Sequence, residues 1–221
     1  MSALAVTAER KTPFIAVDDG WSAKSVHGAN GGRYYDTRLG KNVVRILPGD
    51  YQVTRDDVGL VTTLGSCVSA CIRDVVSGMG GINHFMLPES ELNTANVSSA
   101  RYGSYAMEVL INELLKQGAQ RENLEAKVFG GANVLSSITS CDVGLRNAVF
   151  VRHYLQNEQI PIVAEDLGDT RPRKIVFFPA DGRVLVMRLA AALNRVELDA
   201  ERNYQEELRK KPVTGAVELF D

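Results

Sequence analysis

The sequence lacks the features that most directly identify a metalloprotein or a disulfide-rich protein. It contains only 3 cysteines and 3 histidines in 221 residues, and their spacing matches no recognisable zinc-binding motif. An odd number of cysteines without framework spacing also argues against a disulfide scaffold. We therefore expect no metal site and at least one thiol outside any disulfide.

Long apolar segments and an excess of one charge are missing as well. No stretch approaches the roughly 18 uninterrupted apolar residues of a membrane-spanning helix, and the first residues lack the apolar run of a signal peptide. The formal net charge is only -2. We expect a cytoplasmic protein that does not insert into membranes and has no electrostatic reason to bind nucleic acid.

What is present predicts one folded domain with an extension at each end. Residues 1–40 are rich in Gly, Asn and Ser and predict a flexible N-terminal lead-in, extended or disordered. Residues 41–196 mix short apolar runs with two amphipathic helices, at 102–117 and 144–156. Residues 197–221 predict a charged, solvated C-terminal helix and tail.

Short runs rich in β-branched and aromatic residues predict the strands of this domain. We expect strands at 42–47, 51–53, 60–64, 68–72, 81–87, 124–129, 160–165, 174–178 and 183–189. Residues 93–99 are expected to form a polar loop. Because strands outnumber helices and the helices are interspersed among them, the pattern predicts a layered α/β domain.

The stretch 62–88 holds two of the three cysteines and one histidine, across a predicted hairpin. A hairpin centred on Val75–Val76 would place Cys67 opposite His84. A centre at Ser77–Gly78 would place Cys71 opposite His84 instead. Hairpin register alone therefore leaves the sulfur open, but either pairing would bring a thiol and an imidazole together, as a cysteine nucleophile and its base require.

Local context favours Cys67 as the nucleophile. It follows the Gly65-Ser66 turn, where backbone N–H groups are exposed and could stabilise an oxyanion. Cys71 lies in the middle of an apolar run and is better interpreted as a core residue. A third polar group usually orients the imidazole. Local candidates for this role are Thr62, Thr63, Ser66 and Asn83.

Several blocks, in order, resemble the CheD family of chemoreceptor glutamine deamidases from about Tyr34 onward. They are Leu47-Pro48-Gly49-Asp50-Tyr51, Leu64-Gly65-Ser66-Cys67-Val68, Asn83-His84-Phe85-Met86-Leu87-Pro88, Phe129-Gly130-Gly131-Ala132-Asn133, Gly144-Leu145-Arg146-Asn147, Glu165-Asp166-Leu167-Gly168-Asp169 and the ending Gly215-Ala216-Val217-Glu218-Leu219-Phe220. The interval between Cys67 and His84 also fits the family.

The resemblance implies a three-layer α/β sandwich with mixed and antiparallel sheets and a papain-like Cys-His site. Cys67 would be the nucleophile and His84 the base. The third residue of the family is a threonine shortly before the Gly-Ser-Cys turn. This segment is one residue shorter here than in some members, so Thr62 and Thr63 compete for the role, and we favour Thr62.

The implied function is hydrolysis of specific glutamine side chains to glutamate on methyl-accepting chemotaxis receptors, with release of ammonia through a thioester. No cofactor is required. The alternative function is a mainly non-catalytic regulator that binds a CheC-type phosphatase or the receptors, because some family members also bind such a phosphatase.

Overall fold

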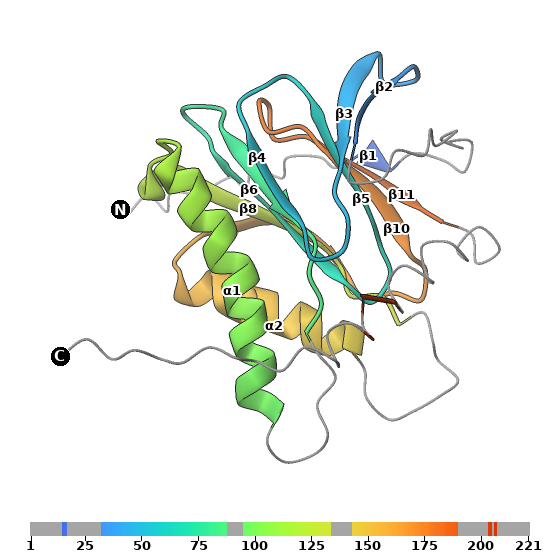
Figure 1. Ribbon diagram of the computed structural model, residues 1–221, viewed down its shortest axis with the longest axis vertical. Coiled ribbons are helices and arrows are strands. Elements are labelled where there is room, and N and C mark those ends of the chain that lie inside the picture. The colour runs from blue at the N-terminus through green and yellow to red at the C-terminus, as the bar shows by residue number, and fades with distance from the viewer. Residues whose placement is uncertain are drawn as a thin grey trace, which may run out of the picture.

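The computed structural model describes residues 15–16, 32–87, 95–133, 143–189, 203–204 and 206. They form two β-sheets and two long α-helices (Figure 1). The predicted α/β class with mixed sheets is confirmed, since each sheet contains both parallel and antiparallel strand pairs.

Sheet A has six strands in the order β1-β11-β10-β5-β3-β2. Their bounds are β1 Ile15–Ala16, β2 Arg33–Asp36, β3 Lys41–Arg45, β5 Gly59–Leu64, β10 Arg173–Phe177 and β11 Val184–Arg188. Sheet B has five strands in the order β4-β7-β6-β8-β9. Their bounds are β4 Tyr51–Thr54, β6 Val68–Asp74, β7 Gly80–Asn83, β8 Leu124–Gly130 and β9 Ile162–Leu167.

Helices α1 (Ala95–Lys116) and α2 (Val143–Asn157) pack on one side of sheet B, and sheet A lies on its other side (Figure 1). Successive side chains of a strand point to opposite faces of the sheet, and strand β6 shows how this places residues in two separate cores. Val68, Ala70 and Ile72 join the core cluster formed with the helices. Cys71, on the opposite face of β6, joins a second cluster between the two sheets, and Cys67 just before the strand belongs to that cluster too.

Most predicted elements match the structure within a few residues, and two boundaries differ clearly. Helix α1 begins at Ala95, within the segment predicted to be a polar loop. Strand β7 ends at Asn83 rather than continuing to residue 87. The reason is local: the N–H of Ala70 donates to Asn83 Oδ1 at 2.9 Å, so a side chain replaces the next backbone bond of the ladder.

Two strands, β1 and β2, lie in the segment predicted to be extended or disordered, and β2 pairs with β3.

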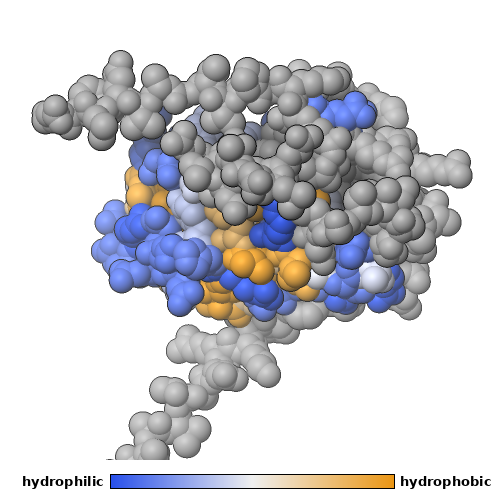
Figure 2. All heavy atoms as spheres, turned by 90° about the horizontal axis from the view of Figure 1, so that it is seen from below, coloured by the Kyte–Doolittle hydropathy of each residue, from blue (hydrophilic) through white to orange (hydrophobic). Residues whose placement is uncertain are grey.

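Seen from below, the surface shows apolar patches between hydrophilic residues (Figure 2). Exposed apolar side chains on the helices include Tyr105, Leu145 and Val149. Of the helices described, none combines the length and apolar character that crossing a bilayer requires.

Candidate active site

The candidate site lies where the chain crosses from one sheet to the other. Strand β5 of sheet A ends at Leu64, and strand β6 of sheet B begins at Val68, so Cys67 occupies the connection between them. The Cys67 side chain is fully buried, and His84 is only 2% exposed. Both therefore lie in the interior rather than on an open surface.

The hairpin register differs from both registers considered in the sequence analysis. Cys71 pairs with Ile82, and an isolated bridge joins Val68 to Phe85 in the same register. Neither cysteine is therefore directly opposite His84. Cys67 is the residue before Val68 and His84 is the residue before Phe85. In this register the two side chains lie on the same face as diagonal neighbours, a separation that side chains on adjacent strands can bridge.

The turn between β6 and β7 explains this register. The Asp74 carboxylate accepts hydrogen bonds from the N–H groups of Val76 and Ser77 at 2.8 and 2.9 Å. Gly78 has a φ of +69°, which a glycine adopts without strain, and its N–H donates to the Asp74 carbonyl at 3.0 Å. An aspartate that binds its own turn centres the hairpin between the two positions we considered.

Thr62 connects the two sheets through His84. Its Oγ1 lies 2.8 Å from His84 Nδ1 and 2.9 Å from the carbonyl oxygen of Ile46. A hydroxyl has one proton, and Thr62 donates it to Ile46, so it accepts from Nδ1–H. The contact thus selects the imidazole tautomer that carries its proton on Nδ1 and leaves Nε2 as the basic nitrogen.

Burial keeps the His84 imidazole neutral. Burial lowers the pKa of His84 to about 3, and the Ile46 carbonyl opposes this shift only partly. Its Nε2 is buried and has no hydrogen-bond partner among the described residues. A buried nitrogen without a partner is costly, and such atoms in native proteins are often functional. In this structure His84 is therefore a neutral imidazole.

The backbone of His84 is held from the side of strand β4. His84 N–H donates to the Asp50 carbonyl at 3.0 Å, and Gly49 N–H donates to the His84 carbonyl at 2.8 Å. These contacts give the Leu-Pro-Gly-Asp-Tyr block a structural role, since it fixes the main chain that carries the imidazole.

The carbonyls of the turn that carries Cys67 are all engaged. The Gly65 carbonyl accepts from Ala132 N–H and the Cys67 carbonyl from Gly131 N–H, both at 2.7 Å. The Ser66 carbonyl accepts from Asn147 Nδ2, also at 2.7 Å. The turn is thus held in one orientation by hydrogen bonds to consecutive residues.

Two glycines, Gly130 and Gly144, lie where the backbone around Cys67 leaves no room for a side chain. A Cβ added at Gly130, where φ is +110°, would lie 2.2 Å from the Cys67 carbonyl oxygen. A Cβ at Gly144 on α2 would lie 2.5 Å from the Gly131 carbonyl oxygen. The Gly-Gly sequence after β8 therefore permits close backbone approach to the candidate nucleophile.

Asn147 is a site-building residue that sequence reasoning missed. It is fully buried on α2, and its Oδ1 accepts from Leu87 N–H at 2.9 Å while its Nδ2 binds Ser66. One side chain thus joins the turn of Cys67 to the segment that follows His84. Its place in the Gly-Leu-Arg-Asn block, one helical turn after a glycine, was the only available signal.

The other predicted residues take different positions. Thr63 alternates to the other face of β5 and pairs with Lys174 across the sheet. Asn83 Nδ2 donates to the Ala106 carbonyl of α1 at 3.1 Å, on the helix side of sheet B and away from the thiol. Cys71 is buried in mid-strand, and burial raises the pKa of its thiol. The third cysteine, Cys141, lies outside the described residues.

Two tyrosines pack against the cluster that contains Cys67. Tyr204, from the C-terminal segment, forms a hydroxyl-to-hydroxyl hydrogen bond with Tyr102 of α1. Its ring lies so near Gly49 that a Cβ there would be 2.9 Å from it. Burial raises the pKa of Tyr204. The charged composition of this segment did not predict this partly buried contact.

The described residues gather no group of three or more side chains suited to hold a metal ion. They do place the imidazole of His84 against the Thr62 hydroxyl, and they hold the main chain of Cys67 on a turn next to the bridge that joins Val68 to Phe85.

Comparison with known proteins gives matches over most of the chain. Residues 86–188 match the family model described as CheD chemotactic sensory transduction. A protein of Methylobacillus flagellatus named probable chemoreceptor glutamine deamidase CheD is 56% identical over 190 residues, which are 85% of this chain and 94% of the relative. Proteins with the same name from Janthinobacterium sp. and Xanthomonas campestris pv. campestris are 55% and 56% identical over 189 residues. These alignments cover 85% and 86% of this chain and 93% and 94% of the relatives.

Among solved structures, the Bacillus licheniformis hypothetical protein YfiH matches with a TM-score of 0.36 and 14% identity, covering 52% of this chain and 49% of that one.

Proposed function

This chain belongs to the CheD family, and from that premise we propose that Cys67, His84 and Thr62 together hydrolyse glutamine side chains of chemoreceptors to glutamate. The protein is a protein-glutamine glutaminase that acts in chemotaxis. Cys67 supplies the nucleophile, His84 moves the proton, and Thr62 orients His84.

The first half-reaction forms a thioester. His84 Nε2 accepts the thiol proton as Cys67 Sγ attacks the carboxamide carbon of the glutamine, and the carbonyl oxygen becomes an oxyanion. The imidazolium then gives its proton to the departing nitrogen. The C–N bond breaks, ammonia leaves, and the acyl group remains on sulfur.

The second half-reaction releases glutamate. His84, neutral again, accepts a proton from water as the water attacks the thioester carbon, and the C–S bond breaks. Proton return from the imidazolium regenerates the thiol. The carbonyls of residues 65–67 hold the turn in place by hydrogen bonds. On this turn we assign the N–H of Cys67 to the oxyanion.

The observation that best supports this proposal is the contact between Thr62 Oγ1 and His84 Nδ1 at 2.8 Å, combined with the unpartnered Nε2. A histidine with one nitrogen fixed and the other available is arranged as a base. We further assign the layers of helices, sheet B and sheet A to a three-layer α/β sandwich with a papain-like dyad.

The partners follow from the substrate. We propose the helical cytoplasmic part of methyl-accepting chemotaxis receptors as the substrate, and hence a cytoplasmic location. A CheC-like phosphatase remains a proposed second partner. A mainly regulatory function would need no reactive thiol, so the chemistry at Cys67 separates the two functions.

The test uses the full chain and a purified receptor cytoplasmic fragment. We expect Cys67→Ala to abolish ammonia release and the Gln-to-Glu mass change in the fragment. Cys71→Ala is the matched control and should retain activity, because Cys71 lies within the strand ladder. Activity that survives in Cys67→Ala but is lost in Cys71→Ala would move the nucleophile to Cys71.

A further inference from the structure

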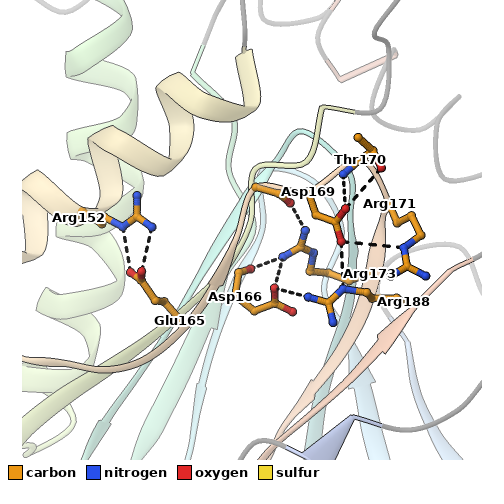
Figure 3. A network of polar contacts seen from close by, with 9 residues as sticks. Arg152, Glu165, Asp166, Asp169, Thr170, Arg171, Arg173 and Arg188 are labelled. Atoms are coloured by element: carbon orange, nitrogen blue, oxygen red, sulfur yellow. Dashed lines mark hydrogen bonds and ion pairs between the residues drawn. The ribbon is translucent and has the colours of Figure 1, made fainter.

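A buried arginine lies beside the turn of the candidate nucleophile. Arg173 begins β10 and pairs through its backbone with Leu64, the last residue of β5 before that turn. Its side chain is fully buried, and among the described residues one carboxylate, that of Asp166, pairs with it at 2.8 Å. Arg188, from β11, contacts the same Asp166 oxygen at 2.9 Å (Figure 3).

Most of the hydrogen bonds of this guanidinium go to main-chain groups. Nη1 donates to the Asp166 carbonyl and Nη2 to the Gly168 carbonyl. The fork of Arg173 thus binds the main chain at the end of β9 and the first residue after it. Because Arg173 itself begins β10, its side chain closes the loop of residues 168–172 between the two strands (Figure 3).

This loop contacts the residues that hold Cys67. Gly168 N–H donates to the Gly130 carbonyl at 2.9 Å, and the Asp169 carbonyl accepts from Asn133 N–H at 2.8 Å. The intervening Gly131 donates to the Cys67 carbonyl at 2.7 Å. A continuous path of hydrogen bonds therefore runs from the guanidinium through two loops to the main chain of the nucleophile.

Stability alone is a weak reason for a buried arginine here. Burying a guanidinium is costly, and well-packed apolar residues often replace buried ion pairs without loss of stability. Asp166 Oδ2 and Arg173 Nε are moreover buried without partners among the described residues. The gain must then come from the fixed geometry of the carbonyls that the fork binds.

We propose that Arg173 is a positioning residue for Cys67: by holding the loop after β9 against the Gly130–Asn133 turn, it sets the position of the thiol relative to His84. The inference rests on the proposed function of Cys67. It adds a residue outside the Cys67, His84 and Thr62 set, whose effect should appear in the chemical step rather than in receptor binding.

The test compares Arg173→Lys with Arg152→Lys. Lysine keeps the charge of Arg173 but presents one nitrogen where two must bind different carbonyls. Arg152 on α2 is the matched control: it is 44% exposed and forms two hydrogen bonds, each of 2.9 Å, with Glu165, the neighbour of Asp166 in β9 (Figure 3). Both variants are assayed with a receptor fragment, by iodoacetamide labelling of Cys67 and by thermal unfolding.

We expect Arg173→Lys to lower kcat by about tenfold or more, with KM nearly unchanged, and to slow labelling of Cys67 in parallel, because small displacements of reacting groups cost rate. Arg152→Lys should leave all of these unchanged. A cooperatively folded Arg173→Lys variant with the kcat and labelling rate of the parent would overturn the inference.

If Arg173→Lys does not fold, a variant of the partly exposed Arg188 tests the inference instead. Arg188→Gln removes support from Asp166 but leaves Arg173 in place, so a lower kcat at constant KM supports the inference and an unchanged kcat overturns it. A parent chain that releases no ammonia overturns the proposed function instead. In that case the labelling rate of Cys67 still tests the positioning role: slower labelling in Arg173→Lys than in the parent supports it, and an equal rate overturns it.

Discussion

Cys67 and Cys71 belong to the same buried cluster, four residues apart, but their main chains have different surroundings. Cys71 lies within the ladder of β6, opposite Ile82 on one side and Lys127 on the other. Cys67 lies before the ladder begins, on a turn whose carbonyls are bound by other loops. Burial does not distinguish the two thiols. The end of the strand does, because there the main chain is bound by loops and a helix rather than by neighbouring strands.

If Cys67 is the nucleophile and His84 its base, the largest loss of activity among these variants should come from changing Thr62, the residue that orients His84. Thr62→Val removes the acceptor of Nδ1–H, and we expect kcat to fall by about 100-fold because the imidazole loses its tautomer and orientation. Thr63→Val is the matched control and should change kcat by no more than about twofold. Steady-state ammonia release measures both. Equal losses in the two variants would contradict the assignment of Thr62.

Asn147 tests whether the anchoring of the turn matters. Asn147→Leu leaves Leu87 N–H and the Ser66 carbonyl without their buried partner, and each such group costs about 1–3 kcal/mol of unfolding free energy. We expect kcat to fall about tenfold as the turn shifts. Asn157→Leu, at the exposed end of the same helix, should change neither quantity. Denaturant unfolding and ammonia release provide the measurements, and an Asn147→Leu variant with parental kcat would contradict the role.

His84 should leave a signature in the pH dependence of stability. Its pKa is 6.5 in the unfolded chain and about 3 when folded, so between these values only the unfolded chain binds the proton. Stability then falls as pH falls, and the parent should lose about 1.4 kcal/mol per pH unit more than His84→Gln within this window. Denaturant unfolding of both proteins from pH 7 to pH 4 measures the difference. Parallel curves would show that the folded site does not keep the imidazole neutral.

Tyr204 should have the smallest effect, on access rather than chemistry. Tyr204→Ala removes a ring packed against the cluster of Cys67, and we expect iodoacetamide to label Cys67 severalfold faster while Cys71 stays unlabelled. Tyr105→Ala, an exposed tyrosine on α1, is the control and should leave both rates unchanged. Slower or unchanged labelling in Tyr204→Ala would contradict a covering role.

The sequence predicted most of the fold and the identity of the nucleophile candidates, but not how they meet. Short, nearly continuous apolar runs identified strands such as β6, because both faces of the strand are buried. The hairpin register was wrong because it depends on the Asp74 side chain binding its own turn. The choice between Thr62 and Thr63 was open in the sequence because it depends on which face of β5 meets sheet B. Asn147 and Arg173 act through contacts between distant segments, which no local pattern reveals.

The most direct test of the account is where a glutamine-directed electrophile attaches. The full chain is treated with a glutamine analogue in which a chloromethyl ketone replaces the carboxamide, and the adduct is mapped by mass spectrometry in the parent and in His84→Gln. We predict a single adduct on Cys67 in the parent and almost none in His84→Gln. An adduct on Cys71, or equal labelling of Cys67 in both proteins, would contradict the claim that Cys67 and His84 form the nucleophile and its base.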